Sequence, residues 1–411
     1  MLDEMFKKAK EASYVLMSIN TDIKDKALAS IAEKLDKCRD EIKRVNDKDI
    51  KYAKQNNLSD AMIDRLLLDD KTIDGMIKAV NDIKAQVDPV GKVVDGFKRP
   101  NGLYITKVKV PLGVVGIIFE SRPNVTIDAA ALCLKSGNVS VLRGGKEAVH
   151  SNTYLGKLMK EAVSEAGLPE ACVNIIEDTD RAVVMEMLKA KEHIDIMVPR
   201  GGKGLIDFCT EHSLIPLVKH DDGICHVFID EHANIDMAAA IAVNAKCQRP
   251  GVCNAMETLL VHQSVAQKIL PKLVSEYAKY DVELRGCERT AKIIKCKDAT
   301  EEDWKTEYLD YILSIKIVSD ISEAIEHINK YGSKHSESIV TENYTNSEMF
   351  LNMVDAAAVY VNASTRWTDG GEFGMGAEIG ISTQKLHCRG PMGADDLTTT
   401  KYRVYGQGQI K

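Results

Sequence analysis

The sequence predicts an α/β protein with two doubly wound parallel sheets, a helical start and a strand-like arm. From residue 103 onward, short apolar runs alternate with helical stretches, which is the pattern of a parallel sheet with covering helices. The alternation occurs in two blocks that meet near residue 222. A length of 411 residues leaves room for two to three domains. We therefore expect domains over 1–222, with a helical start, and over 223–369, followed by a return segment and tail over 370–411.

The composition is that of an ordinary soluble protein, with 45% hydrophobic and 28% charged residues. The formal net charge of −7 argues against a nucleic-acid-binding surface, which needs clustered positive charge. No apolar run approaches the 18 residues of a membrane-spanning helix, so we expect no membrane association. Asp3 and Glu4 put charge where an export signal needs an apolar core, so we expect a cytoplasmic protein.

The first ninety residues predict helices. Apolar residues recur every three or four positions in one stripe from Leu28 to Val45, which predicts one amphipathic helix. A second stripe from Ile73 to Ile83 predicts another. Pro89 and Gly91 end this helical region.

The first α/β block begins with an alternating strand over 103–110, which ends at Pro111 and has one exposed face. Uninterrupted apolar runs follow, as expected of strands covered on both faces. We expect strands at 114–118, 139–142, 173–176, 194–198 and 214–218, with helices at 124–136 and 147–166.

The second α/β block repeats this pattern. We expect strands at 225–229, 257–261, 312–318, 339–340 and 357–361, with helices at 235–246 and 264–277. The tail is rich in glycine and ends in a further strand over 398–405.

Two glycine-rich turns follow strands of the first block and carry cations. One runs from Arg143 through Gly144 and Gly145 to Lys146, and the other includes Gly201 and Gly202. Glycines let the backbone approach an anion, and a helix begins just beyond each turn. Each turn alone is compatible with an ordinary strand-to-helix connection, but the two together favour a cofactor that carries phosphate.

Ten cysteines are spread along the chain without any C-x-x-C pair, so we expect mostly buried thiols and no metal site. Cys253 has a different setting. It lies in a turn between a helix that ends before Pro250 and an apolar strand, with Arg249 nearby. A thiol in such a turn could reach a cleft and have a lowered pKa, whereas the alternative is an inert buried thiol.

Three long segments make a resemblance specific. Residues 110–126, 248–258 and 365–383 resemble the signature stretches of the gamma-glutamyl phosphate reductase family, also called glutamate-5-semialdehyde dehydrogenase, of the aldehyde dehydrogenase superfamily. The resemblance extends over nearly the whole chain. It implies an aldehyde dehydrogenase-like fold with an oligomerisation arm. It also implies NADPH-dependent reduction of L-glutamyl 5-phosphate to L-glutamate 5-semialdehyde and phosphate, the second step of proline biosynthesis.

The resemblance assigns roles to individual residues. Cys253 matches the nucleophile, and Asn124 matches the asparagine whose amide stabilises the oxyanion. Arg143 and Lys146 match positions that contact the adenosine ribose. Many NAD-dependent members carry an acid where this chain has Lys146, so a cation there favours NADPH and its 2′-phosphate. Glu307 aligns with the glutamate that holds the nicotinamide ribose.

The substrate carries a carboxylate and a phosphate, which require cations. Arg122, Arg249 and Arg366 flank the site motifs and are candidates, although each could equally be a solvated surface arginine. Further candidates could hydrogen-bond the amino-acid end of the substrate. They are Asn362, Ser364 and Thr365, which follow the strand that ends at Val361.

One departure from the superfamily pattern bears on the reaction. Hydrolysing members carry a Glu-Leu-Gly-Gly stretch whose glutamate activates water, and this chain has His220-Asp221-Asp222-Gly223 there. The departure disfavours an NAD-dependent hydrolysing dehydrogenase. A second alternative is a related binding protein without activity, which the intact Cys253 and Asn124 argue against.

Partners follow from the same resemblance. The strand over 103–110 and the terminal strand near Tyr402 resemble an oligomerisation arm, so we expect a homodimer or tetramer. The chain has no room for a fused kinase. Glutamate 5-kinase would therefore be a separate protein, with which transient contact is expected.

Overall fold

The computed structural model describes residues 2–411 and consists of two compact units. The first comprises the chain up to Lys219 together with Gly374–Gly380 and Pro391–Lys411. The second comprises His220–Phe373 and Ile381–Gly390. The sequence placed boundaries at 222 and 369 and did not separate the segment that returns to the second unit. Within residues 2–411, no helix has both the length and the apolar character needed to cross a bilayer.

The first unit begins with five helices, and the expected single helix across 28–45 is wrong. Helix α2 ends at Lys37 and α3 begins at Arg39, because Cys38 leaves the helical conformation with φ −101° and ψ 17°. The apolar stripe continues across the break because both helices bury it. The five are α1 (Leu2–Leu16), α2 (Thr21–Lys37), α3 (Arg39–Gln55), α4 (Asp60–Leu66) and α5 (Asp70–Ala85).

A four-stranded parallel sheet forms the centre of the first unit, in the order β5-β4-β3-β6. The apolar runs of these strands are buried because helices cover them. The expected strand at 214–218 is wrong, since only Leu217 forms a bridge, with Met197. The elements are β3 (Val114–Phe119), α6 (Asn124–Lys135), β4 (Val139–Arg143), α7 (Val149–Glu165), β5 (Val173–Ile175), α8 (Arg181–Lys189), β6 (Ile196–Arg200) and α9 (Lys203–His212).

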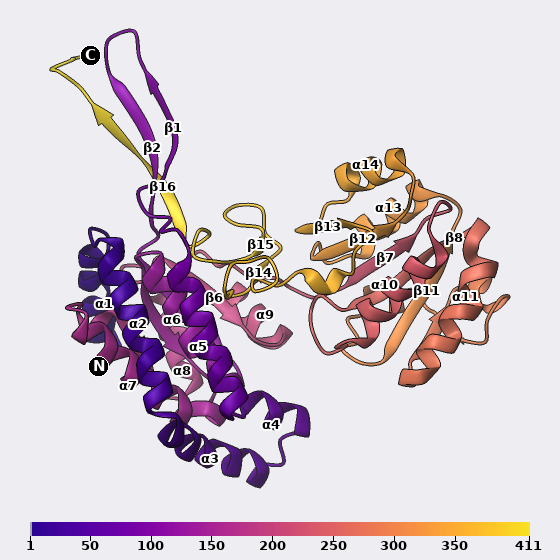
Figure 1. The fold of residues 1–411 in the computed structure, drawn as a ribbon, viewed down its shortest axis with the longest axis horizontal. Coiled ribbons are helices and arrows are strands. Elements are labelled where there is room, and N and C mark those ends of the chain that lie inside the picture. The colour runs from indigo at the N-terminus through magenta and orange to yellow at the C-terminus, as the bar shows by residue number, and fades with distance from the viewer. Residues whose placement is uncertain (1) are drawn as a thin grey trace. The chain divides into compact units, whose positions relative to one another are not determined.

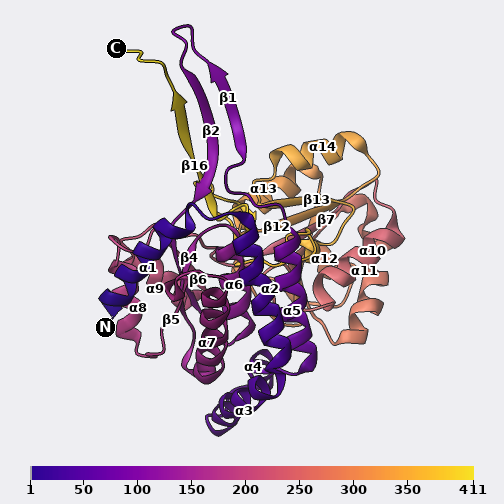
Figure 2. The same ribbon diagram turned by 60° about the vertical axis from the view of Figure 1, so that its left-hand side comes forward.

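Three antiparallel strands form an arm of the first unit (Figures 1 and 2). They are β1 (Val93–Lys98), β2 (Tyr104–Pro111) and β16 (Thr398–Tyr405), with β2 in the middle. Every residue of β1 is exposed, and so is β16 beyond its first residue. The expected strands at 103–110 and 398–405 are therefore confirmed, whereas β1 was not expected.

The second unit is built on a seven-stranded parallel sheet in the order β10-β9-β11-β8-β7-β12-β13. The strands expected from the apolar runs are present, and β9, β10 and three helices were not expected. The elements are β7 (Cys225–Ile229), α10 (Ile235–Cys247), β8 (Met256–His262), α11 (Gln263–Tyr277), β9 (Glu283–Gly286), α12 (Glu288–Ala291), β10 (Lys297–Asp298), β11 (Ile312–Val318), α13 (Ile321–Tyr331), β12 (Ser336–Val340), α14 (Tyr344–Met353) and β13 (Ala358–Val361). Strands β14 (Ile381–Ser382) and β15 (Gly390–Pro391) form a separate pair.

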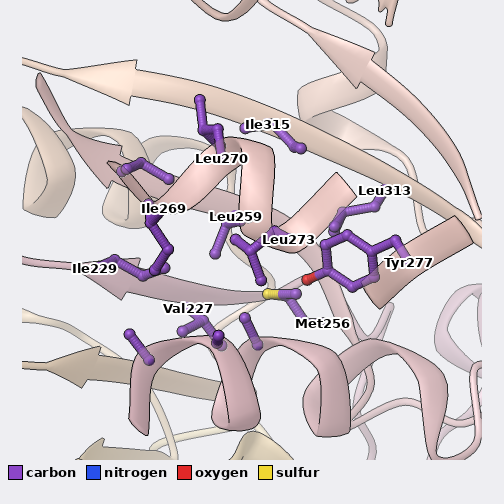
Figure 3. Close-up of a cluster of buried hydrophobic side chains, with 14 of the residues drawn as sticks. Val227, Ile229, Met256, Leu259, Ile269, Leu270, Leu273, Tyr277, Leu313 and Ile315 are labelled. Atoms are coloured by element: carbon purple, nitrogen blue, oxygen red, sulfur yellow. The ribbon is translucent and has the colours of Figure 1, made fainter. Parts of the chain in front are cut away.

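Helices cover both faces of this sheet. Val227 and Ile229 of β7 point into a cluster with α10 and α11, which Figure 3 shows around Leu259, Leu273 and other apolar side chains. Phe228, between them, packs on the opposite face against α13 and α14. Alternate residues of one strand thus enter two cores, which explains its uninterrupted apolar run.

Candidate active site

Cys253 lies in the connection between the end of α10 and the start of β8. The turn is closed by a hydrogen bond of 3.0 Å from the Ala255 amide to the Val252 carbonyl. Cys253 is partly exposed, whereas six of the ten cysteines are buried. The predicted nucleophile therefore lies on a short, constrained loop that directly precedes β8, at the amino end of that strand.

The residue that follows Cys253 fixes this loop. The Thr365 hydroxyl donates to the Asn254 carbonyl over 2.7 Å, and the Asn254 amide donates to the Thr368 carbonyl over 2.9 Å. The Asn254 side-chain oxygen accepts a hydrogen bond from the Arg366 guanidinium. All three partners come from the 3-10 helix Thr365–Trp367 and the residue after it. Thr365, predicted to contact substrate, thus uses its hydroxyl on the nucleophile loop.

Arg366 brings positive charge to the nucleophile loop. Its guanidinium also donates to Gln248 over 2.9 Å, which fixes its direction. Burial lowers the pKa of Arg366 and the neighbouring charge of Arg249 lowers it further, while negative charge on Cys253 opposes this change. Arg366 therefore supplies a cation beside the loop that carries Cys253.

The backbone of Cys253 rests on the start of β7. The Cys225 thiol donates to the Cys253 carbonyl over 3.2 Å. A β-carbon on Gly223 would lie closer than 3 Å to both the carbonyl oxygen and the Cα of Cys253. Only glycine therefore fits at position 223 without displacing the nucleophile.

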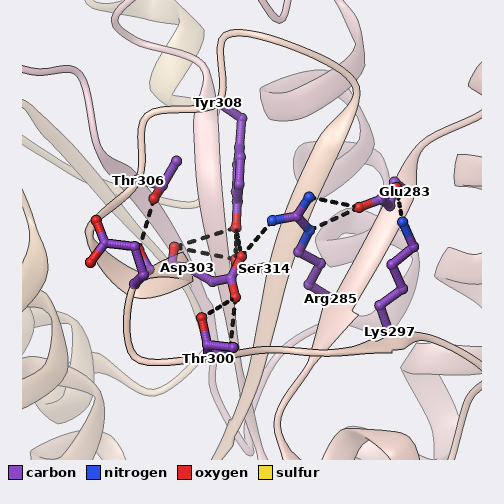
Figure 4. A network of polar contacts seen from close by, with 9 residues as sticks. Glu283, Arg285, Lys297, Thr300, Asp303, Thr306, Tyr308 and Ser314 are labelled. Atoms are coloured by element: carbon purple, nitrogen blue, oxygen red, sulfur yellow. Dashed lines mark hydrogen bonds and ion pairs between the residues drawn. The ribbon is translucent and has the colours of Figure 1, made fainter.

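The Glu307 side chain also packs against Gly223. Its side-chain oxygen lies 2.6 Å from the position that a β-carbon on Gly223 would take, so Glu307 and the backbone of Cys253 approach Gly223 together. A polar network holds the loop that carries Glu307 (Figure 4). The Tyr308 hydroxyl donates to Asp303 over 2.7 Å, and Arg285 donates to the same carboxylate over 2.7 Å. Although burial opposes it, these bonds and those from Thr300 hold the pKa of Asp303 below its usual range.

A buried ion pair holds the other side of this loop. Lys246 and Glu257 are fully buried and lie 2.6 Å apart. The second oxygen of Glu257 accepts a hydrogen bond of 3.2 Å from the Leu309 amide, two residues after Glu307. Leu309 has a φ of 55°, which is costly for a residue other than glycine. The Glu257 carboxylate stabilises that strained conformation and so positions Glu307.

Asn124 belongs to the first unit and is the first residue of α6, directly after Pro123. Proline before the first turn favours this helix start, since its missing N–H needs no partner there. The Asn124 amide donates to the Asp128 carboxylate over 3.0 Å. Arg122 lies in the preceding turn, where its carbonyl accepts from the Val125 amide over 3.0 Å, and it is partly exposed.

The turn after β4 contains the first group of predicted cofactor residues. The Arg143 guanidinium donates to the Thr179 carbonyl over 2.6 Å, and burial lowers its pKa. Its Nε is buried without a hydrogen-bond partner among the described residues. Gly144 is packed against Asn152, and Gly145 against Glu147, so a side chain at either position would have to displace that neighbour. Lys146 is exposed.

The turn after β6 contains the second group. Chain connection reverses direction between β3 and β6, and ligands of such sheets bind at this switch point. Gly201 packs against the Glu120 carboxylate, which accepts a hydrogen bond of 3.0 Å from the Gly202 amide. No atom lies within 4 Å of the position of a β-carbon on Gly202, so the space beside this turn is open. The open turn, the unpartnered Arg143 Nε and the exposed Lys146 fit a phosphate-bearing cofactor.

The remaining predicted substrate residues lie near the end of β13. The Asn362 amide is engaged on both sides by the Thr341 backbone, with two hydrogen bonds of 2.9 Å. The Ser364 hydroxyl is buried and accepts from the Arg366 amide over 3.3 Å. Arg249 is exposed. Contact of these residues with substrate stays a prediction.

The structure thus gathers Cys253, Glu307, Arg366 and Thr365 in the second unit, and it adds three residues that the sequence analysis did not single out. Cys225 and Asn254 hold the nucleophile loop, and Asp128 holds the Asn124 amide. Asp128 had a detectable signal, because residues four apart on a helix share a face. Cys225 had none, because its contact depends on the pairing of β7 with β8.

Comparison with known proteins gives a consistent result. A family model described as the aldehyde dehydrogenase family matches residues 1–293. The chain is 57% identical over 410 residues to a gamma-glutamyl phosphate reductase of Nautilia profundicola, covering 100% of both chains. It is 54% identical to the protein of that name from Clostridium tetani, covering 98% of this chain and 97% of the relative.

Solved structures agree with this relationship. A crystal structure of gamma-glutamyl phosphate reductase from Thermotoga maritima superposes with a TM-score of 0.97 at 50% identity, covering 99% of each chain. An acetylating aldehyde dehydrogenase from Geobacillus thermoglucosidasius shares the fold at a TM-score of 0.71 and 20% identity, covering 99% of this chain and 97% of its own.

Proposed function

Because this chain belongs to the aldehyde dehydrogenase family, and within it to the gamma-glutamyl phosphate reductases, we propose that it reduces L-glutamyl 5-phosphate to L-glutamate 5-semialdehyde and phosphate. This is the second step of proline biosynthesis from glutamate. The observation that carries the mechanism is the partly exposed Cys253 on a loop fixed by Asn254, Cys225 and Gly223.

Cys253 acts as the nucleophile in this proposal. Its thiolate attacks the γ-acyl carbon, forming a carbon–sulfur bond while the carbonyl π electrons move to oxygen. The Asn124 amide and a backbone N–H donate hydrogen bonds to that oxyanion. Collapse of the tetrahedral species breaks the carbon–oxygen bond to phosphate, which leaves with the electron pair, and a thioester on Cys253 remains.

The second half of the reaction releases the aldehyde. NADPH, when bound, supplies the hydride that reduces the thioester carbon. Hydride addition leaves a thiohemiacetal alkoxide on Cys253. As its oxygen re-forms the carbonyl, the carbon–sulfur bond breaks to give the semialdehyde and the thiolate. The fixed loop keeps the sulfur in one position through both halves, since Asn254 and Cys225 hold the backbone on either side.

The cofactor is held by the two glycine-rich turns in this proposal. Gly144, Gly145, Gly201 and Gly202 form the turns that contact it, with open space beside Gly202. Arg143 and Lys146 contact the adenosine ribose in this proposal. An exposed lysine at position 146 suits the extra phosphate of NADPH. Glu307, whose loop is fixed by Asp303 and Glu257, accepts hydrogen bonds from the nicotinamide ribose.

His220 stands where hydrolysing members of the superfamily carry their water-activating glutamate. Its ring faces the ring of the buried His335, with centroids 5.8 Å apart. Burial lowers the pKa of His335 to about 3, so His335 is neutral and adds no charge there. With histidine in place of that glutamate, the thioester is left to react with hydride or, in reverse, with phosphate. This supports a phosphate-dependent reaction over hydrolysis.

Arginines neutralise the substrate in this proposal. Arg122, Arg249 and Arg366 supply positive charge for the phosphate and the α-carboxylate, and Arg366 is held beside the nucleophile loop by its hydrogen bond to Asn254. Guanidinium groups suit both anions because they donate paired hydrogen bonds. Asn362, Ser364 and Thr365 remain candidates for the amino-acid end.

The arm supports assembly into a homodimer or tetramer. Strands β1 and β16 are its edges, and both present large exposed apolar side chains, among them Phe97, Tyr402 and Val404. Open edges with apolar side chains are commonly covered by another copy of the chain. Light scattering at micromolar concentration tests this proposal, and a monomeric mass would remove it.

The labile acyl phosphate must come from glutamate 5-kinase. We place both enzymes in the cytoplasm, where thiols such as Cys253 stay reduced, and we propose that they meet transiently. A pull-down without association, together with free diffusion of the intermediate, would remove that contact from the proposal.

The reverse reaction tests the function. Semialdehyde, phosphate and NADP are supplied, and reduction of the cofactor is followed by absorbance. We expect phosphate-dependent turnover that disappears in Cys253→Ala and persists in Cys247→Ala, a control at a buried cysteine in the same unit. Turnover by Cys253→Ala, or turnover without phosphate, would contradict the mechanism.

A further inference from the structure

Helix α6 places a carboxylate directly behind the proposed oxyanion donor. Asn124 and Asp128 are four residues apart and so lie on one face of the helix. The Asn124 amide donates to one oxygen of Asp128 over 3.0 Å. An amide nitrogen has two hydrogens, so this bond leaves the other available for a substrate oxygen.

The charge of Asp128 is not neutralised by direct contact within the described residues. It accepts a hydrogen bond from Asn124, which is uncharged. Its interaction with Arg200 is electrostatic, without a hydrogen bond. Arg200 itself lies 3.8 Å from Glu378 and packs over Gly380. Burial raises the pKa of Asp128 to about 6, and an approaching cation would reverse that effect. Asp128 as a whole is half-buried, so its carboxylate is shielded from bulk water without the residue being sealed in the core.

The substrate carries a cation at a matching distance. In a γ-glutamyl group, three carbon–carbon bonds and one carbon–nitrogen bond separate the acyl carbon from the ammonium, which places them about 5 Å apart. A hydrogen bond of about 3 Å from the oxyanion to the Asn124 amide, followed by the bond to Asp128, places the carboxylate about 7 Å from the acyl carbon. The ammonium lies about 5 Å from the acyl carbon, and a hydrogen bond adds about 3 Å. The ammonium can therefore reach the Asp128 carboxylate.

We propose that Asp128 binds the α-ammonium group of the substrate and makes the enzyme specific for amino-acid substrates. The inference rests on the proposed function. It gives the four functional groups of the substrate separate partners: arginines for the two anions, Asn124 for the acyl oxygen and Asp128 for the ammonium. Asp128 thereby discriminates against acyl phosphates and aldehydes of the same length that lack the amino group.

A merely positioning role for Asp128 predicts something different. If the carboxylate only orients the Asn124 amide, its loss slows every substrate alike, because all substrates develop the same oxyanion. Recognition of the ammonium slows only substrates that carry one. Asp128→Asn separates the two roles, since its side-chain oxygen still accepts from Asn124 while the negative charge is removed.

The experiment compares two aldehydes in the phosphate-dependent reverse reaction. One is glutamate 5-semialdehyde, and the other is 5-oxopentanoate, which has the same carbon chain and carboxylate without the amino group. Wild type is expected to prefer the semialdehyde in kcat/KM. In Asp128→Asn we expect about a 10- to 100-fold loss for the semialdehyde, as for other hydrogen bonds to charged groups, and a change within about twofold for 5-oxopentanoate.

Two further variants keep the test independent of folding. Asp207→Asn, at an exposed aspartate of the first unit, is the matched control and should change neither rate. Asn124→Ala, which keeps Asp128, should slow both aldehydes and preserve the preference. An unchanged preference in Asp128→Asn, or a lost preference in Asn124→Ala, would overturn the role of Asp128. Wild type inactive with both aldehydes would instead overturn the proposed function.

Discussion

The Cys225 thiol donates a hydrogen bond to the backbone carbonyl of Cys253 over 3.2 Å. Burial raises the pKa of Cys225 well above its usual value, and the charges of Glu337 and Cys253 act in the same direction. Cys225 therefore remains a protonated donor while Cys253 reacts. The buried Cys225 thus serves as a hydrogen-bond donor, whereas the partly exposed Cys253 serves as the nucleophile.

We expect Cys225→Ala to lower kcat about five- to tenfold and to change KM less than about twofold, because the nucleophile loop loses one restraint. Cys225→Ser, which keeps a donor of similar size, should restore most of the loss. Steady-state kinetics in the reverse reaction measures both values. Cys247→Ala serves as the control, and equal losses in Cys225→Ala and Cys225→Ser would argue against the hydrogen bond.

Gly223→Ala should remove activity by about 100-fold or more, since the new methyl group would displace the backbone of Cys253. Gly75→Ala in α5 is the control, because nothing lies within 4 Å of the position of its β-carbon. That variant should keep full activity and gain about 1 kcal/mol in free energy of unfolding. Wild-type turnover in Gly223→Ala would show that this contact is unimportant.

Lys146→Glu should reverse the preference between cofactors. The carboxylate would repel the 2′-phosphate and accept from a ribose hydroxyl, so kcat/KM with NADP should fall about 10- to 100-fold relative to NAD. Lys157→Glu, on the exposed face of α7, changes the net charge equally and should leave the ratio unaltered. An unaltered ratio in Lys146→Glu would exclude its contact with the 2′-phosphate.

The buried pair of Lys246 and Glu257 should show strong coupling in urea unfolding. Lys246→Met and Glu257→Leu each leave a buried charge without its partner, which costs about 3–5 kcal/mol. The double variant should lose less than the sum, because neither charge remains. The exposed pair Lys78 and Asp82 should couple by less than about 1 kcal/mol. Additive losses at the buried pair would contradict the prediction.

Asp355 should give the second unit an acid-dependent contribution to stability. Lys385 and Arg389 lower the pKa of Asp355 to about 2. Because the folded pKa lies below the unfolded value of about 4, the contribution is present above pH 4 and is lost as the pH falls towards 2. The side chain is 35% exposed, so we expect less than about 1 kcal/mol.

Urea unfolding between pH 2 and pH 6 measures this contribution. The difference in unfolding free energy between wild type and Asp355→Asn should be largest near pH 6 and vanish near pH 2. Asp47→Asn, at an exposed aspartate of α3, should show no such trend. A difference that grows as the pH falls would refute the assigned sign.

The sequence predicts the central strands well because burial on both faces leaves an uninterrupted apolar run, as at Val227, Phe228 and Ile229. The prediction fails where contacts with another segment of the chain determine the secondary structure. Strand β1 is exposed and is held by pairing with β2. The break at Cys38 falls inside an apolar stripe that continues unchanged across it.

The site shows the same division. Cys253 stands out because a turn between a helix and a strand exposes it, and this information is local. Cys225, Gly223 and Glu307 meet near it through chain segments that are distant in sequence, so no spacing rule indicates their contact. Asp128 lies between these cases, since helical periodicity joins it to Asn124 but does not reveal the hydrogen bond.

The arm has a consequence for how the protein is made. Its middle strand, β2, pairs with β16, which follows all of the second sheet in the chain, and Asn138 donates to the Leu397 carbonyl over 2.8 Å. During translation, the seven strands β7–β13 can all leave the ribosome before β16 exists. A nascent chain must therefore keep one edge of β2 unpaired until β16 has been synthesised.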